Sequence, residues 1–142
     1  MSDVDFTKLR ILTVDDEPFM RQLLTRVLGE LEVAKVTEAV DGDDGLTKFT
    51  NARNAYDLII CDLEMPNMDG FEFVRRLREK KFLPNANIPI LIVTGHSDPE
   101  SVQSAVKAGI HGYLVKPVSK EALEKRISAA LTSSAIDPKR VK

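Results

Sequence analysis

The chain has 142 residues, of which 43% are hydrophobic and 30% charged, and its formal net charge is −2. This length suits a single domain with a hydrophobic core, and without a basic excess nothing indicates a nucleic-acid or anionic-membrane partner. The single cysteine excludes an internal disulfide and a cysteine-based zinc site, while the acidic N-terminus and the short apolar runs argue against a signal peptide and a membrane span.

Five short apolar segments of the sequence predict β-strands. Three of them are apolar nearly throughout, as is typical of parallel strands that are covered on both faces. The second segment, within VAKVTEA, is more polar and suits the edge of a sheet. The predicted strands are residues 9–14, 33–37, 58–61, 90–94 and 112–115.

Helical patterns lie between these strands and after the last one. Apolar residues repeat at helical spacing in residues 19–31, and Pro18 stands where a first helical turn accepts proline. Gly29 falls in the last turn and leaves the end of this helix open. A second helix is expected over residues 43–50 or 44–50.

The remaining three helices have recognisable start signals. Asp69, with Glu72 three residues later, resembles a capping box and opens the third helix. The pair Asp98-Pro99 starts the fourth helix, and Gly109 marks its end. Ser119 caps the fifth helix. Strands that alternate with helices in this way predict a parallel sheet with helices on both faces.

Polar residues end or follow four of the predicted strands. In an open parallel sheet, ligands bind beyond the carboxyl ends of the strands, so these residues are candidates for a site. Carboxylates gathered at that edge need a neutralising cation, and oxygen ligands beside a phosphate favour Mg²⁺. A carboxylate can also accept a phosphoryl group, whose oxygens a lysine and a hydroxyl would stabilise. The residues concerned are Asp15, Asp16, Glu17, Asp62, Thr94 and Lys116.

Four motifs occur in the order and with the spacing of a known family. They are VDDE at 14–17, DLEMPNMDG at 62–70, VTG at 93–95 and AGIHGYLVKP at 108–117. Together they resemble the receiver domain of two-component response regulators, in its stand-alone, chemotaxis-type (CheY-like) form. The resemblance implies a doubly wound, flavodoxin-like α/β fold with a five-stranded parallel sheet of order 2-1-3-4-5 and five helices. We expect the receiver domain at 8–132, after a short extension (1–7) and before a flexible tail (133–142).

The resemblance implies a role for each of the matched acids. Asp62 corresponds to the phosphoacceptor, which takes a phosphoryl group from the phosphohistidine of a sensor kinase. Asp16 corresponds to a direct ligand of Mg²⁺, and Asp15 to an acid that acts largely through a bound water. The metal site would also include Asp62 and the backbone carbonyl of Glu64.

The resemblance also implies roles for residues on the later strands. Thr94 corresponds to a hydroxyl that hydrogen-bonds a phosphoryl oxygen, and Lys116 to the ammonium that pairs with it. The bond between Lys116 and Pro117 corresponds to a peptide bond that is cis in the family. Tyr113 corresponds to the switch aromatic, which turns inward when Thr94 moves toward the phosphate.

Two further positions correspond to sites that tune autodephosphorylation in receivers. They are Glu64, two residues past the acceptor, and His96, two residues past the threonine. Glu64 could repel or reposition the attacking water, and His96 could shield the phosphate or pair with Glu64. The sequence leaves these alternatives open.

The implied partners are a sensor histidine kinase or phosphotransfer protein upstream and a target protein downstream. The target would read the surface of the fourth helix, fifth strand and fifth helix, through which two copies of the chain could also pair as a homodimer. We expect no nucleic-acid contact, no membrane insertion and a cytoplasmic location. Because a tail of about ten residues is too short for a second domain, output must come from protein binding or a phosphorelay.

Taken singly, most of these residues also fit simpler structural roles, and only their combination favours a site. Lys116 alone would be a solvated surface lysine, and the acids at 15–17 a solvated helix start. His96 and His111 are expected at exposed loop positions without a metal role. Cys61 is expected to be an inert buried thiol.

Two other functions are alternatives to a phosphoacceptor switch. A phosphorylation-independent interaction module on the same fold would usually lack an acid, the hydroxyl or the lysine, whereas this chain keeps all of them. A Mg²⁺-dependent phosphatase of the haloacid-dehalogenase type also forms an aspartyl-phosphate, but its D-x-D motif follows the first strand. Here adjacent Asp15 and Asp16 follow the first strand, and Asp62 follows the third. We therefore expect a signalling domain, not an enzyme beyond its own phosphorylation and dephosphorylation.

Overall fold

The computed structural model describes residues 4–52, 55–80, 83, 85–95 and 99–132. After a short 3₁₀ turn at Phe6–Lys8, strands and helices alternate along the chain. The strands are β1 (Arg10–Val14), β2 (Lys35–Ala39), β3 (Leu58–Cys61), β4 (Ile90–Thr94) and β5 (Gly112–Val115). The helices are α1 (Pro18–Glu30), α2 (Gly42–Ala52), α3 (Gly70–Arg78), α4 (Pro99–Ala108) and α5 (Lys120–Thr132). His96, Asp98 and the tail expected at 133–142 lie outside the described residues.

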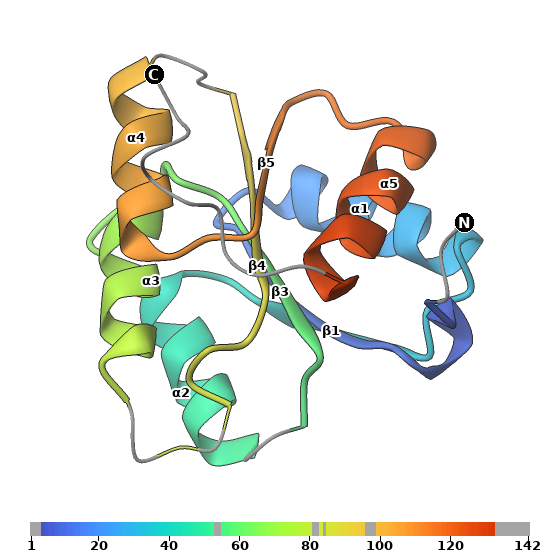
Figure 1. Cartoon of the computed structure of the whole chain (residues 1–142), viewed down its shortest axis with the longest axis horizontal. Coiled ribbons are helices and arrows are strands. Elements are labelled where there is room, and N and C mark those ends of the chain that lie inside the picture. Colours follow the sequence, from blue (N-terminus) through green and yellow to red (C-terminus); the bar gives the residue numbers. More distant parts are fainter. Residues whose placement is uncertain (1–3, 53–54, 81–82, 84, 96–98, 133–142) are drawn as a thin grey trace.

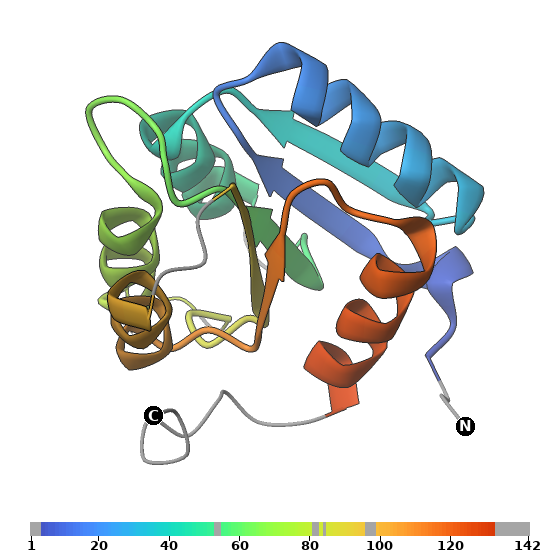
Figure 2. The ribbon, with the colours of Figure 1, turned by 90° about the horizontal axis from the view of Figure 1, so that it is seen from above.

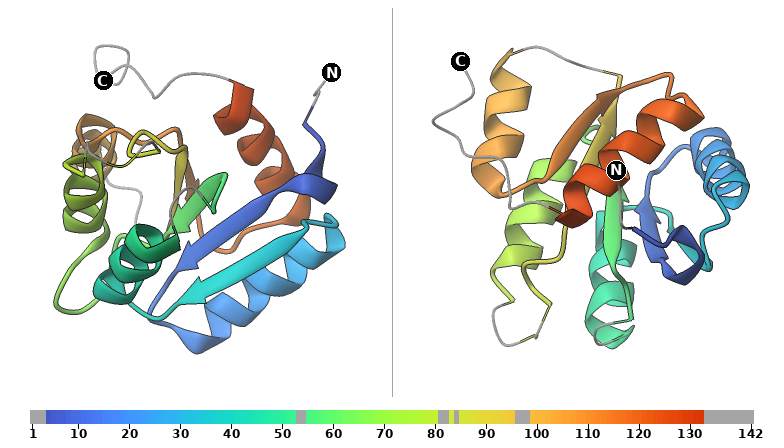
Figure 3. Two further views of the ribbon diagram at one scale, coloured as in Figure 1. Left: turned by 90° about the horizontal axis from the view of Figure 1, so that it is seen from below. Right: turned by 45° about the vertical axis from the view of Figure 1, so that its right-hand side comes forward.

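The strands pair in parallel, in the order β2-β1-β3-β4-β5. This order confirms the doubly wound α/β fold that the resemblance implied. The more polar segment forms β2 at one edge, as expected, where it lies beside β1 (Figure 3). Because all these strands run in one direction, their carboxyl ends lie along the same edge of the sheet.

Helices cover both faces of the sheet. α1 and α5 lie on one face, and α2, α3 and α4 lie on the other (Figures 1 and 2). Successive residues of a strand therefore enter different cores. Leu12 and Ile59 pack on the side of α2, α3 and α4, whereas Ile11 and Ile60 pack on the side of α1 and α5. The need to fill both cores explains why the central strands are apolar nearly throughout.

The second strand begins two residues later than the sequence pattern predicted. The N–H of Val33 donates to the carbonyl of Leu28, and Glu32 has a φ of 64°. This is the hydrogen bond and the left-handed turn that close the C-terminus of a helix. Val33 therefore belongs to the end of α1, and the chain pairs with β1 only from Lys35 onward.

Side-chain caps precede three of the helices, α2, α3 and α5. Asp69 accepts a hydrogen bond from the N–H of Glu72 over 2.9 Å, and Ser119 accepts one from the N–H of Ala122 over 3.1 Å, which confirms both predicted caps. The prediction for α2 was wrong by at least one residue. Its cap is Asp41, which accepts from the N–H of Asp44 over 2.8 Å, so the helix begins at Gly42. Among the described residues, none of the helices has the length and apolar composition that crossing a membrane requires.

Candidate functional site

Backbone hydrogen bonds continue the pairing of the sheet just past the carboxyl ends of its strands. The N–H of Asp62 donates to the carbonyl of Val14 over 3.0 Å, and the N–H of Lys116 donates to the carbonyl of Thr94 over 2.8 Å. The sheet therefore fixes the backbone of both residues. Asp62 is held against the end of β1, and Lys116 against the end of β4.

Three of the predicted acids form a compact cluster at this edge. Asp15, Asp16 and Asp62 each offer a carboxylate oxygen within 4.8 Å of the other two. Asp15 and Asp62 are 2% and 3% exposed, and Asp16 is half-buried. Buried like charges at this separation repel one another, so the cluster favours a bound cation. A set of carboxylate oxygens fits Mg²⁺, the metal that the sequence led us to expect.

Asp15 is oriented by groups from the start of α1. The N–H of Glu17 donates to Asp15 Oδ1 over 2.9 Å, and Arg21 Nη1 donates to the Asp15 carbonyl oxygen over 2.7 Å. Burial raises the pKa of the Asp15 carboxyl, against the opposing effects of the Glu17 hydrogen bond and the Lys116 charge. A perturbed carboxyl that also has a specific charged partner is typical of functional sites.

Lys116 brings a positive charge into the acidic cluster. Its Nζ lies 3.2 Å from Asp62 Oδ2, 3.3 Å from Asp15 Oδ2 and 3.0 Å from Glu17 Oε1. Burial alone would lower the pKa of Lys116, but the hydrogen bond to Glu17 and the charges of the two aspartates raise it above its usual value. Lys116 is therefore charged at neutral pH. The peptide bond between Lys116 and Pro117 is cis, as the resemblance implied.

The loop after β3 is shaped around Asp62. The N–H of Glu64 donates to Asp62 Oδ1 over 3.3 Å, while the side chain of Glu64 is exposed. Asn67 has a φ of 70°, a left-handed conformation that asparagine tolerates better than most residues. At Gly70, a Cβ would collide with the carbonyl oxygen of Asp62. Glycine therefore allows α3 to begin directly against the residue that carries the candidate acceptor carboxylate.

Thr94 lies on β4, which pairs with β3, and Tyr113 lies on β5, the edge strand beyond β4. Thr94 ends β4 and is fully buried. Tyr113 is half-buried and packs against the core on the side of α2, α3 and α4. In the sheet register, Tyr113 pairs with Ile92, two residues before Thr94.

A comparison with known protein families identifies the chain. The family described as "Response regulator receiver domain" matches residues 11–128. The chain belongs to this family. Receiver domains are phosphorylated on an aspartate in two-component signalling, bind Mg²⁺ at an acidic pocket, and interact with histidine kinases and downstream effectors.

Curated proteins and solved structures agree with this assignment. The chain is 39% identical to the gliding motility regulatory protein of Myxococcus xanthus, over 77% of this chain and 13% of that protein. It is 38% identical to the transcriptional regulatory protein ResD of Bacillus subtilis, over 86% of this chain and 48% of that protein. The solved structure of the chemotaxis response regulator CheY4 of Vibrio cholerae has a TM-score of 0.75 at 37% identity, covering 87% of this chain and 99% of that one. The chain thus spans about half of ResD and a much smaller part of the Myxococcus protein.

The contact of the Glu17 side chain with Lys116 is a feature of this receiver domain that the sequence did not predict. Glu17 was noted as part of the acidic end of the first strand, but no contact was assigned to its side chain. The available signal was the third acid of VDDE, which follows the two predicted metal ligands directly. Cys61, in contrast, is buried as expected, and burial raises the pKa of its thiol well above the usual value.

His111 lies in the loop before β5, as predicted, but the prediction that it is exposed was wrong. His111 is half-buried, and its Nδ1 accepts a hydrogen bond from the N–H of Ile90 over 3.4 Å. Burial, together with the positive charge of Arg78, lowers the pKa of His111. The contact forms because His111 precedes β5 and meets the first residue of β4, at the sheet edge opposite the acidic cluster. His111 is therefore tied into the structure of that edge.

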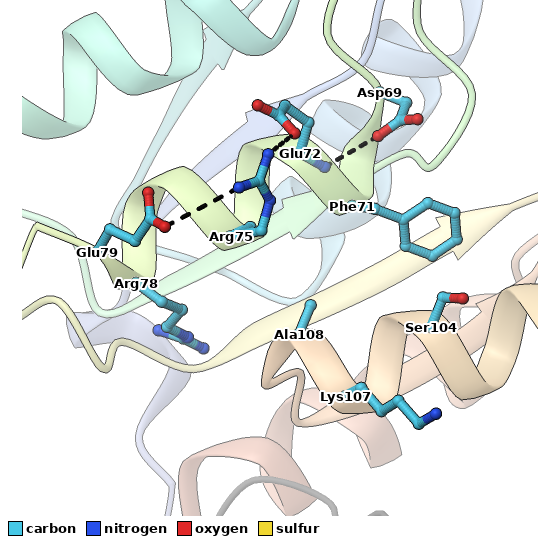
Figure 4. Close-up of a pocket in the computed structure, with 9 residues that line it drawn as sticks. All are labelled: Asp69, Phe71, Glu72, Arg75, Arg78, Glu79, Ser104, Lys107 and Ala108. Carbon is cyan, nitrogen blue, oxygen red and sulfur yellow. Dashed lines mark hydrogen bonds and ion pairs between the residues drawn. The ribbon is translucent and has the colours of Figure 1, made fainter.

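A groove with a volume of about 640 Å³ lies between α3 and α4 in the receiver domain (Figure 4). Phe71, Ser104 and Ala108 are among its lining residues. Charged side chains from α3 also line it, and Arg75 pairs there with Glu72 on one side and lies 4.0 Å from Glu79 on the other. The lining residues come from the two helices and the two residues that cap α3, Asp69 and Glu79, and not from the strand ends that carry the acidic cluster.

Proposed function

We propose that Asp62 accepts a phosphoryl group from the phosphohistidine of a sensor histidine kinase or a phosphotransfer protein. The observation that carries this proposal is the 3.2 Å contact between Lys116 Nζ and Asp62 Oδ2, inside a cluster of buried acids. A solvated helix start would leave such acids exposed and unpaired with a distant lysine. Their convergence from separate strands supports a site built for phosphoryl chemistry.

In the transfer, a carboxylate oxygen of Asp62 forms a bond to phosphorus while the bond from phosphorus to the histidine ring nitrogen breaks. The electron pair of the broken bond returns to the ring nitrogen, which takes up a proton from solvent. Lys116 holds a positive charge beside the accepting carboxylate and would pair with a phosphoryl oxygen. The hydroxyl of Thr94 would hydrogen-bond another.

Asp15, Asp16, Asp62 and the backbone carbonyl of Glu64 would hold Mg²⁺ in this site. When bound, the ion offsets negative charge on the phosphoryl oxygens as the group is transferred. The hydrogen bond from the backbone of Glu17 would keep the Asp15 carboxylate turned toward the cluster. The exposed side chain of Glu64, together with His96, would then govern how water reaches the phosphoryl group and thus how long it persists.

Thr94 and Tyr113 would carry the signal away from the site. Movement of the Thr94 hydroxyl toward the phosphoryl group would leave space into which the half-buried ring of Tyr113 could turn. Contacts to the phosphoryl group would in this way shift the population toward a second arrangement of α4, β5 and α5. That surface would bind a downstream target protein, unless the group is passed on in a phosphorelay.

The test is intact mass after incubation with acetyl phosphate, with and without Mg²⁺. Wild type should gain one phosphoryl group only when Mg²⁺ is present, and Asp62→Asn should gain none. Asp43→Asn, which removes an exposed acid from the start of α2, is the control and should behave as wild type.

Labelling that persists in Asp62→Asn would refute Asp62 as the acceptor. If wild type gains no group under any of these conditions, the phosphorylation-independent interaction module becomes the better description of the chain.

A further inference from the structure

Lys116 has one carboxylate partner that differs in kind from the other two. Asp15 and Asp62 belong to the buried acidic cluster, whereas the side chain of Glu17 is 62% exposed and lies outside that cluster. Even so, Glu17 makes the shortest of the three contacts, with 3.0 Å between its Oε1 and the Nζ of Lys116.

The side chain and the backbone of Glu17 act on different groups. Glu17 is the N-cap residue of α1, yet its side chain makes no capping hydrogen bond, and Pro18 follows it in the first turn. Its carboxylate is therefore available to Lys116, while its backbone N–H orients Asp15. A Glu17→Gln substitution changes the charge seen by Lys116 and leaves the backbone hydrogen bond in place.

We propose that Glu17 is a positioning residue that holds the Lys116 ammonium in the unphosphorylated site and releases it when a phosphoryl group arrives. This inference rests on the proposed function of Asp62. A phosphoryl oxygen on Asp62 would compete with Glu17 for the same ammonium. Asp62 would itself carry the phosphoryl group, so Lys116 stays beside it. The contact that Lys116 gives up would be the one with the exposed side chain of Glu17.

This arrangement makes Glu17 oppose the phosphorylated state. Its negative charge stabilises the resting position of Lys116, and that contact must be broken before the ammonium can pair with a phosphoryl oxygen. Loss of that charge should shift the equilibrium toward the phosphorylated form. Because the pair is partly exposed, we expect a change of about threefold in affinity for a phosphoryl mimic.

The experiment measures the affinity for beryllofluoride, a phosphoryl mimic, by calorimetry in saturating Mg²⁺. Glu17→Gln should bind it about threefold more tightly than wild type. Glu30→Gln removes the same charge from the exposed end of α1 and should match wild type. In a Lys116→Met background, the Glu17→Gln substitution should have no further effect, because Glu17 acts through Lys116.

A second measurement reports the contact without any phosphoryl chemistry. In protein labelled with ¹⁵N-lysine, the Nζ resonance of Lys116 should shift in Glu17→Gln and stay in place in Glu30→Gln. This readout applies even if Lys116→Met binds the mimic too weakly to measure.

Three results would each overturn the proposal. They are an unchanged beryllofluoride affinity in Glu17→Gln, an equal gain in affinity with and without Lys116, and an unmoved Lys116 resonance. A wild type that neither binds beryllofluoride nor gains a phosphoryl group would instead refute the function proposed for Asp62, and the role of Glu17 with it.

Discussion

Charged side chains meet in two parts of this receiver domain, and they do so in different ways. At the carboxyl edge of the sheet, Asp15, Asp62 and Lys116 come from three different strand ends and are largely buried. Along the groove between α3 and α4, Arg75 and Glu72 are neighbours on one helix, and the Arg75 side chain is 58% exposed. The first group depends on the sheet topology, whereas the second needs only one helix.

This difference determines what each group of charges does. Pairs three or four residues apart on a helix surface stabilise it weakly, because water solvates the charges when they separate. Buried charges brought together by the fold have no such alternative, so the removal of one leaves the others uncompensated. The buried charges at the carboxyl edge of the sheet are therefore the ones that a ligand or a phosphoryl group can rearrange with a large effect.

The largest expected effect is on the lysine of the acidic edge. Lys116→Met leaves the buried carboxylates of Asp15 and Asp62 without their shared cation, and should lower the free energy of unfolding by about 3 kcal/mol. Urea unfolding in the presence of a chelator measures this loss. Lys125→Met, at an exposed position on α5, is the matched control. Equal losses of unfolding free energy in the two variants would show that Lys116 contributes no more to stability than an exposed surface lysine.

An intermediate effect is expected at Arg78, a residue of the groove whose charge is partly buried, as the charges at the sheet edge are. Arg78 is half-buried, and its guanidinium donates to the carbonyl oxygens of Gly109 and Ala86. Burial lowers the pKa of Arg78 to about 10. Arg78→Met leaves both carbonyls without this donor and should lower the free energy of unfolding by about 2 kcal/mol. Urea unfolding measures it.

The matched control for Arg78 is its neighbour on the exposed side of α3. Arg76→Met removes a pair with Glu72, and both partners keep access to water. Its effect should be much smaller than that of Arg78→Met. If Arg76→Met proved as harmful, exposure would not explain the difference between the charged residues of α3.

The sequence predicted which residues meet at the acidic edge better than it predicted the contacts that they make there. Strand ends can be read from apolar runs, and parallel strands place Asp15, Asp62, Thr94 and Lys116 at one edge by topology alone. The contact of Glu17 could not be read in this way, because it depends on how far a flexible side chain reaches. The start of β2 was misplaced because the turn that closes α1 uses Val33, an apolar residue that resembles the beginning of a strand.

His111, at the opposite edge of the sheet, also has surroundings that the sequence did not predict. Its substitution gives the smallest expected effect. Burial and the charge of Arg78 lower its pKa below the ordinary value of 6.5. A lowered pKa in the folded state means that folding favours the neutral ring, which accepts the hydrogen bond from Ile90. Its stabilising contribution is therefore present above the ordinary pKa and is lost as the pH falls through the lowered value.

His111→Gln tests this dependence, because glutamine cannot gain a proton over the same range. Between about pH 7.5 and about pH 5, wild type should lose more unfolding free energy than the variant. Urea unfolding at several pH values gives both curves. Parallel curves would mean that His111 titrates alike in the folded and unfolded chain, and that its half-buried position has no consequence for stability. Curves that diverge on acidification would place a titrating group at this edge of the sheet, far from the cluster of Asp15, Asp16 and Asp62 at the other.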